Sequence, residues 1–233
     1  MSGYYTEKLA AERLRACYEL APPRVQTYLE SEICIVLSRV STATTVLELG
    51  CGYGRVLRHL VSRAGSVVGI DTSPRSLQMA REIVASANPP HLLVMDAARM
   101  GFRDHVFDLT ICIQNGICAF AADQLCLLRE AARVTRTGGR LLLSSYSPRF
   151  WDDRLEWFGR QAAHGLIGEI DHDATGDGVI VCRDGFRTTT IDADGFRKLA
   201  AAIGLVPQVV EVDGSSLFCE IVIPETKMDA GAL

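Results

Sequence analysis

Five short apolar runs, separated by segments with helical patterns, constrain the fold of this 233-residue chain more than any other feature. The runs are rich in β-branched residues or leucine, and the segments between them carry helix start signals, such as Ser73 before Pro74 and Asp123 before an amphipathic stretch. Continuous apolar strands that alternate with helices predict a parallel sheet covered by helices on both faces. The predicted strands are residues 46–49, 67–70, 92–95, 107–113 and 141–143.

The segments on either side complete this pattern. Apolar residues recur at helical spacing before and after Pro22-Pro23, so two helices precede the first strand. The helix that Asp123 begins is expected to end at Gly138-Gly139. Asp192 then begins one more helix, and the last two strands form a hairpin that turns at Asp213-Gly214.

Residues 146–191 differ in character from the alternating part. Their first half contains both tryptophans of the chain, Trp151 and Trp157, among other aromatic residues, and residues 179–182 and 186–191 have the pattern of a short antiparallel hairpin. We therefore expect an insertion that forms a lid. The predicted parts are an N-terminal helical cap (1–40), an α/β core (41–145), the lid and hairpin (146–191), a closing helix and hairpin (192–226) and a tail (227–233).

Composition excludes several classes of protein. The 28 acidic and 24 basic residues leave a net charge of −4, without the basic excess that nucleic-acid binding usually requires. No uncharged apolar run approaches the roughly 20 residues of a membrane helix, and residues 1–8 lack a secretory pattern. We expect a soluble, cytoplasmic protein, either a monomer or a homodimer, with no membrane and no nucleic-acid partner.

The eight cysteines form no Cys-x-x-Cys pair, and several lie inside apolar runs. This pattern favours reduced core thiols and no metal site. The alternative is a site for a soft metal or arsenic, for which the distant thiols of Cys51, Cys182 and Cys219 would have to converge.

The first predicted strand runs into a turn with three alternate glycines, Gly50, Gly52 and Gly54. Glycines allow a ligand to approach the main chain closely. A dinucleotide-binding Gly-x-Gly-x-x-Gly loop would place its third glycine at position 55, where this chain has Arg55. The carboxylate of Glu48 at the strand end would repel a phosphate, so the loop suits a cationic ligand better.

Further acidic residues follow the next two strands. Asp71, followed by Thr72, ends the second strand, where a carboxylate in such folds binds both ribose hydroxyls. Asp96 follows the third strand, where its carboxylate and the backbone amide of Ala97 can hold an adenine edge. Because the carboxyl ends of parallel strands meet at one edge of a sheet, we expect these groups to form one site.

In this combination of motifs the chain resembles the class I S-adenosylmethionine-dependent methyltransferase family, of the type 11/25-like small-molecule kind. The resemblance covers about residues 40–145 and the closing helix and hairpin. It implies a Rossmann-like, seven-stranded, mostly parallel sheet with an antiparallel last strand, S-adenosylmethionine as cofactor and S-adenosylhomocysteine as product. It gives the methionine end to the glycine loop, ribose to Asp71, adenine to Asp96 and Ala97, and places Gln114 and Asn115 near the methionine end and the acceptor.

The sequence says less about the residues that would bind or activate the methyl acceptor. His164 and His172 are the candidate general bases, because they lie between the fifth strand and the closing helix, although a lone histidine is more often a surface residue. Four aromatic residues are candidates for binding the methyl acceptor. They either line a small-molecule pocket or pack between the lid and the core. They are Tyr5, Tyr18, Tyr146 and Trp151.

Three functions remain open at this point. The motifs favour an enzyme of class EC 2.1.1 that methylates oxygen or nitrogen of a small-molecule acceptor. An NAD-dependent oxidoreductase is disfavoured by Arg55 and Asp96. A non-catalytic cofactor-binding protein of the same fold is the third alternative, which would bind the cofactor and methylate nothing.

Overall fold

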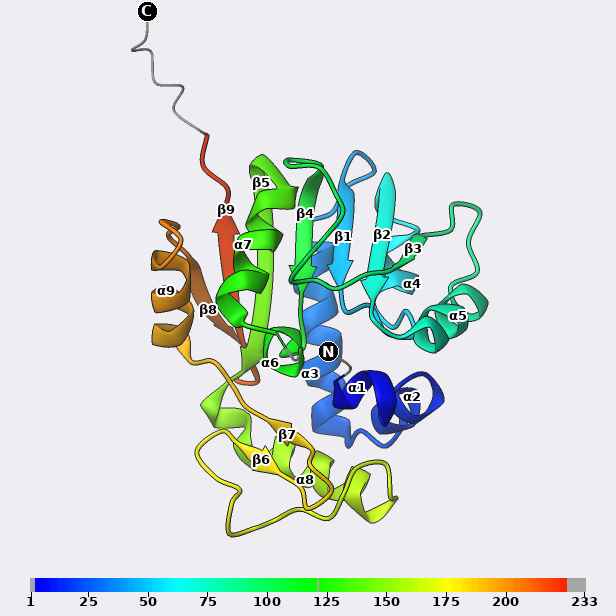
Figure 1. Ribbon diagram of the computed structural model, residues 1–233, viewed down its shortest axis with the longest axis vertical. Coiled ribbons are helices and arrows are strands. Elements are labelled where there is room, and N and C mark those ends of the chain that lie inside the picture. The colour runs from blue at the N-terminus through cyan, green and yellow to red at the C-terminus, as the bar shows by residue number, and fades with distance from the viewer. Residues whose placement is uncertain (1–2, 121, 226–233) are drawn as a thin grey trace, which may run out of the picture.

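The computed structural model describes residues 3–120 and 122–225, which form a central seven-stranded sheet in the order β3-β2-β1-β4-β5-β9-β8 (Figure 1). Strands β1 to β5 pair with one another in parallel, whereas β9 pairs antiparallel with both β5 and β8. The predicted mixed sheet with an antiparallel last strand is therefore confirmed. The strands are β1 (Thr45–Leu49), β2 (Ser66–Asp71), β3 (His91–Val94), β4 (Phe107–Cys112), β5 (Thr135–Tyr146), β8 (Gln208–Val212) and β9 (Ser216–Val222).

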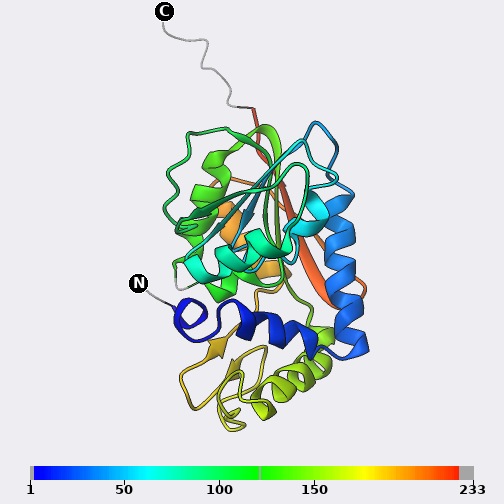
Figure 2. The same ribbon diagram turned by 90° about the vertical axis from the view of Figure 1, so that its right-hand side faces the viewer.

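Helices cover both faces of the sheet, as the continuous apolar strands require. One face packs against α3, which runs along the sheet in Figure 2, and against α4 and α5; the other packs against α7 and α9. Ser73, Asp123 and Asp192 each accept a hydrogen bond from a backbone N–H of the helix that they begin, as predicted. The helices are α3 (Pro23–Leu37), α4 (Leu57–Leu60), α5 (Pro74–Ile83), α7 (Gln124–Val134) and α9 (Ala193–Ala201).

A further layer lies beyond the carboxyl ends of the parallel strands, at the bottom of Figure 1. In Figure 2 the N-terminal helices lie between the sheet and the inserted segment. The indole Nε1–H of Trp157 donates to the carbonyl of Cys17 at 2.8 Å, which fastens the insertion to α2. This layer contains α1 (Tyr4–Glu7), α2 (Glu12–Glu19), α6 (Gly116–Ala119), η1 (Pro148–Phe150), α8 (Trp151–Ala163), β6 (Ile180–Val181) and β7 (Arg187–Thr188).

The predicted end of α7 is wrong. The helix ends at Val134 and β5 begins at Thr135, so Gly138-Gly139 lie inside the strand. The hydroxyl of Thr135 donates to the carbonyl of Ala131 and lies 2.7 Å from the hydroxyl of Thr110 on β4, while its backbone is already in register with Phe107. Pairing with β4 therefore ends the helix before the glycines are reached.

The hairpin of the insertion is shorter than predicted. Its paired strands, β6 and β7, have two residues each, and they are joined by residues 182–186. Residues 175–178, which include two glycines and an aspartate typical of turns, form a separate bend closed by a bridge between Gly176 and Val179. The predicted tail, 227–233, lies outside the described residues. Over the described parts of the chain, no helix is long and apolar enough to cross a bilayer.

Replacing Gly159 with alanine is expected to raise the free energy of unfolding by about 0.5–1 kcal/mol, measured by urea denaturation. Gly159 lies inside α8, and a Cβ built on it meets no heavy atom within 4 Å. Gly165 has equally open surroundings but a φ of +67°, so Gly165→Ala is the matched control and should destabilise. Equal stabilisation by both changes would contradict the backbone argument.

Candidate functional site

The glycine loop follows β1 and lies against α6. Gly50 has a φ of +69°, and a Cβ built on it would lie 2.5 Å from the ring of Phe120. Only glycine fits there, because both the backbone conformation and the close ring exclude a side chain. The aromatic ring of Phe120 thus covers the glycine loop directly, and the sequence did not predict this contact.

Asp71 at the end of β2 is held in place by backbone groups. Its Oδ2 accepts from the N–H of Gly52 at 2.9 Å, and its Oδ1 accepts from the N–H of Ser73 at 2.8 Å. Burial raises the pKa of this carboxyl, and these backbone donors oppose the shift. A carboxylate has about four acceptor positions, so about two remain for a ligand.

A cavity of about 430 Å³ extends from the glycine loop past the ends of β2 and β3. Gly50, Asp71, Thr72, Asp96 and Ala97 all line it, so the structure brings these sequence-predicted residues together. Asp96 lies two residues beyond β3, where its Oδ1 accepts from the N–H of Ala98 at 2.9 Å. Tyr5, Ser76 and Phe120 complete the wall from the cap, α5 and the segment after α6.

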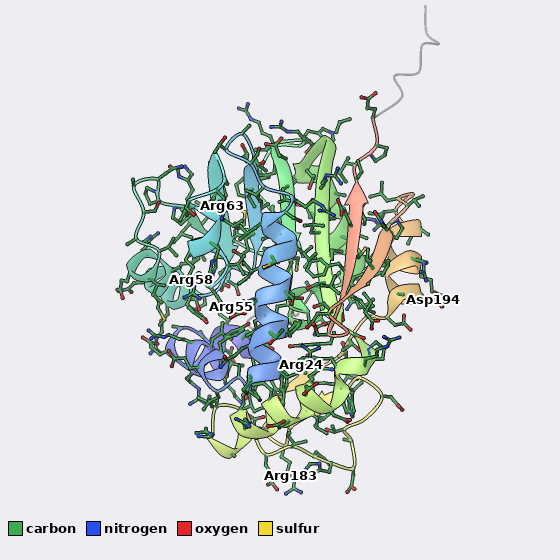
Figure 3. All side chains as sticks on the ribbon, turned by 180° about the vertical axis from the view of Figure 1, so that it is seen from behind. Arg24, Arg55, Arg58, Arg63, Arg183 and Asp194 are labelled. Atoms are coloured by element: carbon green, nitrogen blue, oxygen red, sulfur yellow. The ribbon has the colours of Figure 1, made fainter. Side chains whose placement is uncertain are left out.

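A narrower cavity of about 100 Å³ adjoins the first one, and both are lined by Tyr5, Gly50 and Phe120. The Oε1 of Gln114 accepts hydrogen bonds from the hydroxyl of Tyr18 and, at 2.9 Å, from Arg55 Nη2. Figure 3 shows Arg55 beside α3, close to the N-terminal helices. The residues that line this cavity include Glu48, Gly52, Tyr18, Arg55 and Gln114.

Glu48 is the unusual acidic group of the narrow cavity. Its side chain is buried, at 5% exposure, and its Oε2 has no hydrogen-bond partner among the described residues. Burial raises the pKa of Glu48 to about 8; the nearby charge of Asp71 also raises it, while Arg55 opposes the shift. An unpaired acid of this kind favours a cationic group in the cavity.

Gln114 is positioned through its backbone as well. Its N–H donates to Ser144 Oγ at 2.6 Å, and that hydroxyl donates to the buried carboxylate of Glu32 on α3, also at 2.6 Å. Gln114 and Asn115 both have positive φ values, +55° and +59°. The chain after β4 therefore turns sharply, and the side chain of Gln114 is held toward the narrow cavity.

Asn115 lies outside the two cavities at the glycine loop. It lines neither of these two cavities, and its side-chain amide donates to the carbonyl of Thr189 at 2.8 Å and accepts from Ser145 Oγ at 2.9 Å. These bonds connect β4 to the strand and loop that flank the insertion. The structure therefore places Asn115 as a link between the core and the insertion.

A third and larger cavity, of about 940 Å³, lies between the insertion, the start of α7 and α9. Tyr146 and Trp151 line it, whereas Tyr5 and Tyr18 line the two smaller cavities, Tyr5 both of them and Tyr18 the narrow one. Arg154 of α8 also lines the large cavity. The four aromatic candidates are thus divided between two sides of the site.

Neither candidate base reaches these cavities. His164 ends α8, where its Nδ1 lies 2.8 Å from the carbonyl of Arg160, and His172 is exposed on the following loop. Neither histidine lines the three cavities described above. Among the described residues, no group of three or more His, Cys, Asp or Glu side chains is arranged to hold a metal ion.

Sequence reasoning missed the direct roles of Phe120 and Glu32. Each depends on contacts between elements that are far apart in the chain, and no local motif marks them. From the sequence, Arg55 stands out only because it occupies the position of the third glycine of a dinucleotide-binding loop. Its partner Gln114 lies 59 residues away, so the hydrogen bond between them could not be read from spacing.

Comparison with known proteins agrees with this geometry. Residues 46–139 match the family described as methyltransferase domain. The chain is 28% identical to the 2-methyl-6-phytyl-1,4-hydroquinone methyltransferase of Synechocystis, over 66% of the chain and 51% of the relative. It is 31% identical to the chloroplastic tocopherol O-methyltransferase of Arabidopsis thaliana, over 45% of the chain and 30% of the relative. The chain thus spans about half the length of these curated relatives, or less.

Solved structures share the fold. The magnesium protoporphyrin IX methyltransferase of Synechocystis, solved with S-adenosylhomocysteine, is 19% identical with a TM-score of 0.63, over 94% of this chain and 96% of that one. The N-methyltransferase NodS of Bradyrhizobium japonicum is 14% identical with a TM-score of 0.56, over 86% and 97%. Residues 46–139 thus match a methyltransferase domain, and the sheet of the chain has the fold of solved S-adenosylmethionine-dependent methyltransferases.

Proposed function

We propose that the protein transfers a methyl group from S-adenosylmethionine to an oxygen or nitrogen of a small-molecule acceptor. The observation that carries this proposal is the pair of joined cavities at the carboxyl ends of β1 to β3. The wide cavity offers Asp71 with acceptor positions to spare, and the narrow one offers the unpaired carboxylate of Glu48. A ligand with a ribose at one end and positive charge at the other matches both.

In this proposal the wide cavity holds the adenosine part. Asp71 and Thr72 contact the ribose, while Asp96 and the backbone of Ala97 contact the adenine edge. The narrow cavity holds the methionine part against Gly50 and Gly52, with Glu48 and Gln114 as polar partners. Gly54, the third glycine of the motif, lines neither cavity; a Cβ built on it would lie 2.7 Å from Val84 and 3.2 Å from Ala80, so this glycine allows the loop to pack closely against α5. Asn115 contributes indirectly, since it ties the chain next to Gln114 to the insertion.

Methyl transfer to an aligned acceptor is an in-line displacement at a carbon that the positive sulfonium of the donor already activates. The protein then needs chiefly to orient two molecules and to exclude water. The N-terminal helices and the insertion cover the strand ends and supply that enclosure (Figure 2). Since His164 and His172 lie away from the cavities, the proposal assigns no proton transfer to either one.

We also make proposals about the binding partners, the cellular location and the oligomeric state of the protein. The net charge of −4 favours a protein without a nucleic-acid partner. The cysteines, which are all free among the described residues, are compatible with the reducing cytoplasm. We propose a cytoplasmic monomer or homodimer, which sedimentation of the purified protein would test.

Calorimetry with S-adenosylmethionine, S-adenosylhomocysteine and NAD tests the cofactor, and transfer of a radiolabelled methyl group to a panel of phenols, carboxylic acids and amines tests the reaction. We expect both adenosyl ligands to bind and at least one acceptor to become labelled. Preferential binding of NAD would support the oxidoreductase. Adenosyl binding without labelling of any acceptor would support a non-catalytic binding protein.

Trp151→Ala is expected to leave the affinity for S-adenosylmethionine unchanged and to reduce acceptor turnover by roughly tenfold, about 1.4 kcal/mol in kcat/KM. The reason is that Trp151 lines the large cavity and neither cofactor cavity. Leu155, half-buried on the same helix and absent from the lining of the large cavity, gives the matched variant Leu155→Ala. Equal turnover of both variants would favour a packing role for Trp151.

A further inference from the structure

Arg154 is a buried cation in the first turn of α8. Its side chain is only 1% exposed, which is rare for an arginine. Nη1 donates to the carbonyl of Gly178 at 2.8 Å and Nη2 to Thr188 Oγ1 at 3.3 Å, while Nε has no hydrogen-bond partner among the described residues. The guanidinium lies 4.5 Å from the ring centroid of Tyr146. Its donors are therefore only partly used.

No carboxylate balances this charge within the described residues, whose ion pairs do not include Arg154. The groups that act on it most strongly are the hydroxyls of Tyr146, Tyr28 and Tyr5, which are neutral at neutral pH. Burial lowers the pKa of the guanidinium. A buried charge without a counter-charge is costly, so a ligand that supplies one would be bound strongly.

The position of Arg154 connects the two sides of the site. It lines the large cavity together with Tyr146 and Trp151, which offer flat apolar walls. Thr188 Oγ1, which accepts from Arg154, also accepts from the side-chain amide of Asn115 at 3.4 Å, and the neighbouring Gln114 lines the narrow cavity. A group bound at Arg154 would therefore lie on the side of the large cavity that is linked to the narrow cavity.

We infer that Arg154 is the anion receptor of the acceptor pocket, and that the acceptor carries a carboxylate next to a flat apolar body. This inference rests on the proposed methyltransferase function and specifies its substrate class. A carboxylate matches the planar guanidinium and neutralises its single charge. The other charged residues of the lining are Asp177, Asp192 and Lys198, so the two acids outnumber the one lysine, and a phosphate dianion would add one more negative charge than a carboxylate does.

Three matched pairs of ligands test the inference on the full-length protein: benzoate, 2-naphthoate and anthracene-9-carboxylate, each compared with its neutral amide. Binding is measured by calorimetry with S-adenosylhomocysteine at saturation. We expect at least one carboxylate to bind about tenfold more tightly than its amide, because only the carboxylate pairs with Arg154. If no carboxylate is preferred over its amide, Arg154 is not an anion receptor.

Arg154→Gln should abolish the preference, while Arg154→Lys should retain part of it because the charge remains. The control is Arg149→Gln, since the Arg149 side chain is 78% exposed and pairs with Glu211 outside the large cavity. A preference that survives Arg154→Gln in a folded variant would overturn the inference. If Arg154→Gln does not fold, the comparison of each carboxylate with its amide on the wild-type protein still tests the inference.

Failure of the inference can be told apart from failure of the proposed function. If S-adenosylhomocysteine binds but carboxylates are not preferred, the inference alone is wrong. If S-adenosylhomocysteine does not bind, the methyltransferase proposal is wrong, and the inference that rests on it falls with it.

Discussion

Asp71→Ala is expected to weaken the binding of S-adenosylmethionine by about 1–3 kcal/mol, or roughly 5- to 150-fold in Kd. The carboxylate lines the wide cavity, and backbone donors from Gly52 and Ser73 fix its orientation. Its loss removes the charge-assisted acceptors that we propose for the ribose hydroxyls. It also frees the N–H of Gly52, which loosens the glycine loop. Calorimetry with the purified variant measures the change.

A control separates the ligand contact from a general loss of stability. Asp104 is exposed and pairs with Arg133 far from the cavities, so Asp104→Ala should bind S-adenosylmethionine like the wild type. Asp96→Ala should have a smaller effect than Asp71→Ala, because Asp96 is more exposed and uses one oxygen to cap a turn. Unchanged affinity in a folded Asp71→Ala protein would refute the ribose role.

The predictable part of this fold is the part that local patterns determine. The five apolar runs and the capping residues Ser73, Asp123 and Asp192 gave the parallel sheet and its helices, because each strand is buried on both faces and each cap lies within three residues of its target. Asp71 and Asp96 could be predicted to lie near each other for the same reason: the carboxyl ends of parallel strands share one edge.

The unpredicted part depends on tertiary contacts. The end of α7 is set by the pairing of Thr135 with β4, which overrides the glycines four residues later. The cavity wall at Phe120 and the partner of Gln114 come from segments far apart in sequence. Arg154 is the clearest case, because a single arginine on an amphipathic helix normally faces solvent, and only the packing of the insertion buries it.

The charge of Glu48 leads to the second large prediction, which concerns pH. Its pKa of about 8 in the folded protein lies above the value of 4.5 for an unperturbed carboxyl. Between these values the folded chain holds a proton that the unfolded chain has lost. The free energy of unfolding should therefore fall as pH rises from about 4.5 to 8, by at most about 1.4 kcal/mol per pH unit, and level off above.

The affinity for the ligand should change with pH in the opposite direction to the stability. A cationic ligand in the narrow cavity favours ionised Glu48, so binding below about pH 8 must release its proton, and the affinity for S-adenosylmethionine should rise toward that pH. Calorimetry in buffers of different ionisation enthalpy measures the released proton directly. Arg55 also acts on Glu48, but an arginine remains protonated near neutral pH and contributes no pH dependence of its own.

Glu48→Gln keeps the size of the side chain and removes the titration. We expect the variant to be more stable than the wild type at pH 8, because no buried carboxylate has to ionise, and to bind S-adenosylmethionine more weakly at that pH. Any titration of the ligand itself appears equally in both proteins and cancels in the comparison. The assignment fails if Glu48→Gln releases as many protons on binding as the wild type does. In that case the proton comes from another group, and the narrow cavity is not where the positive charge of the ligand is recognised.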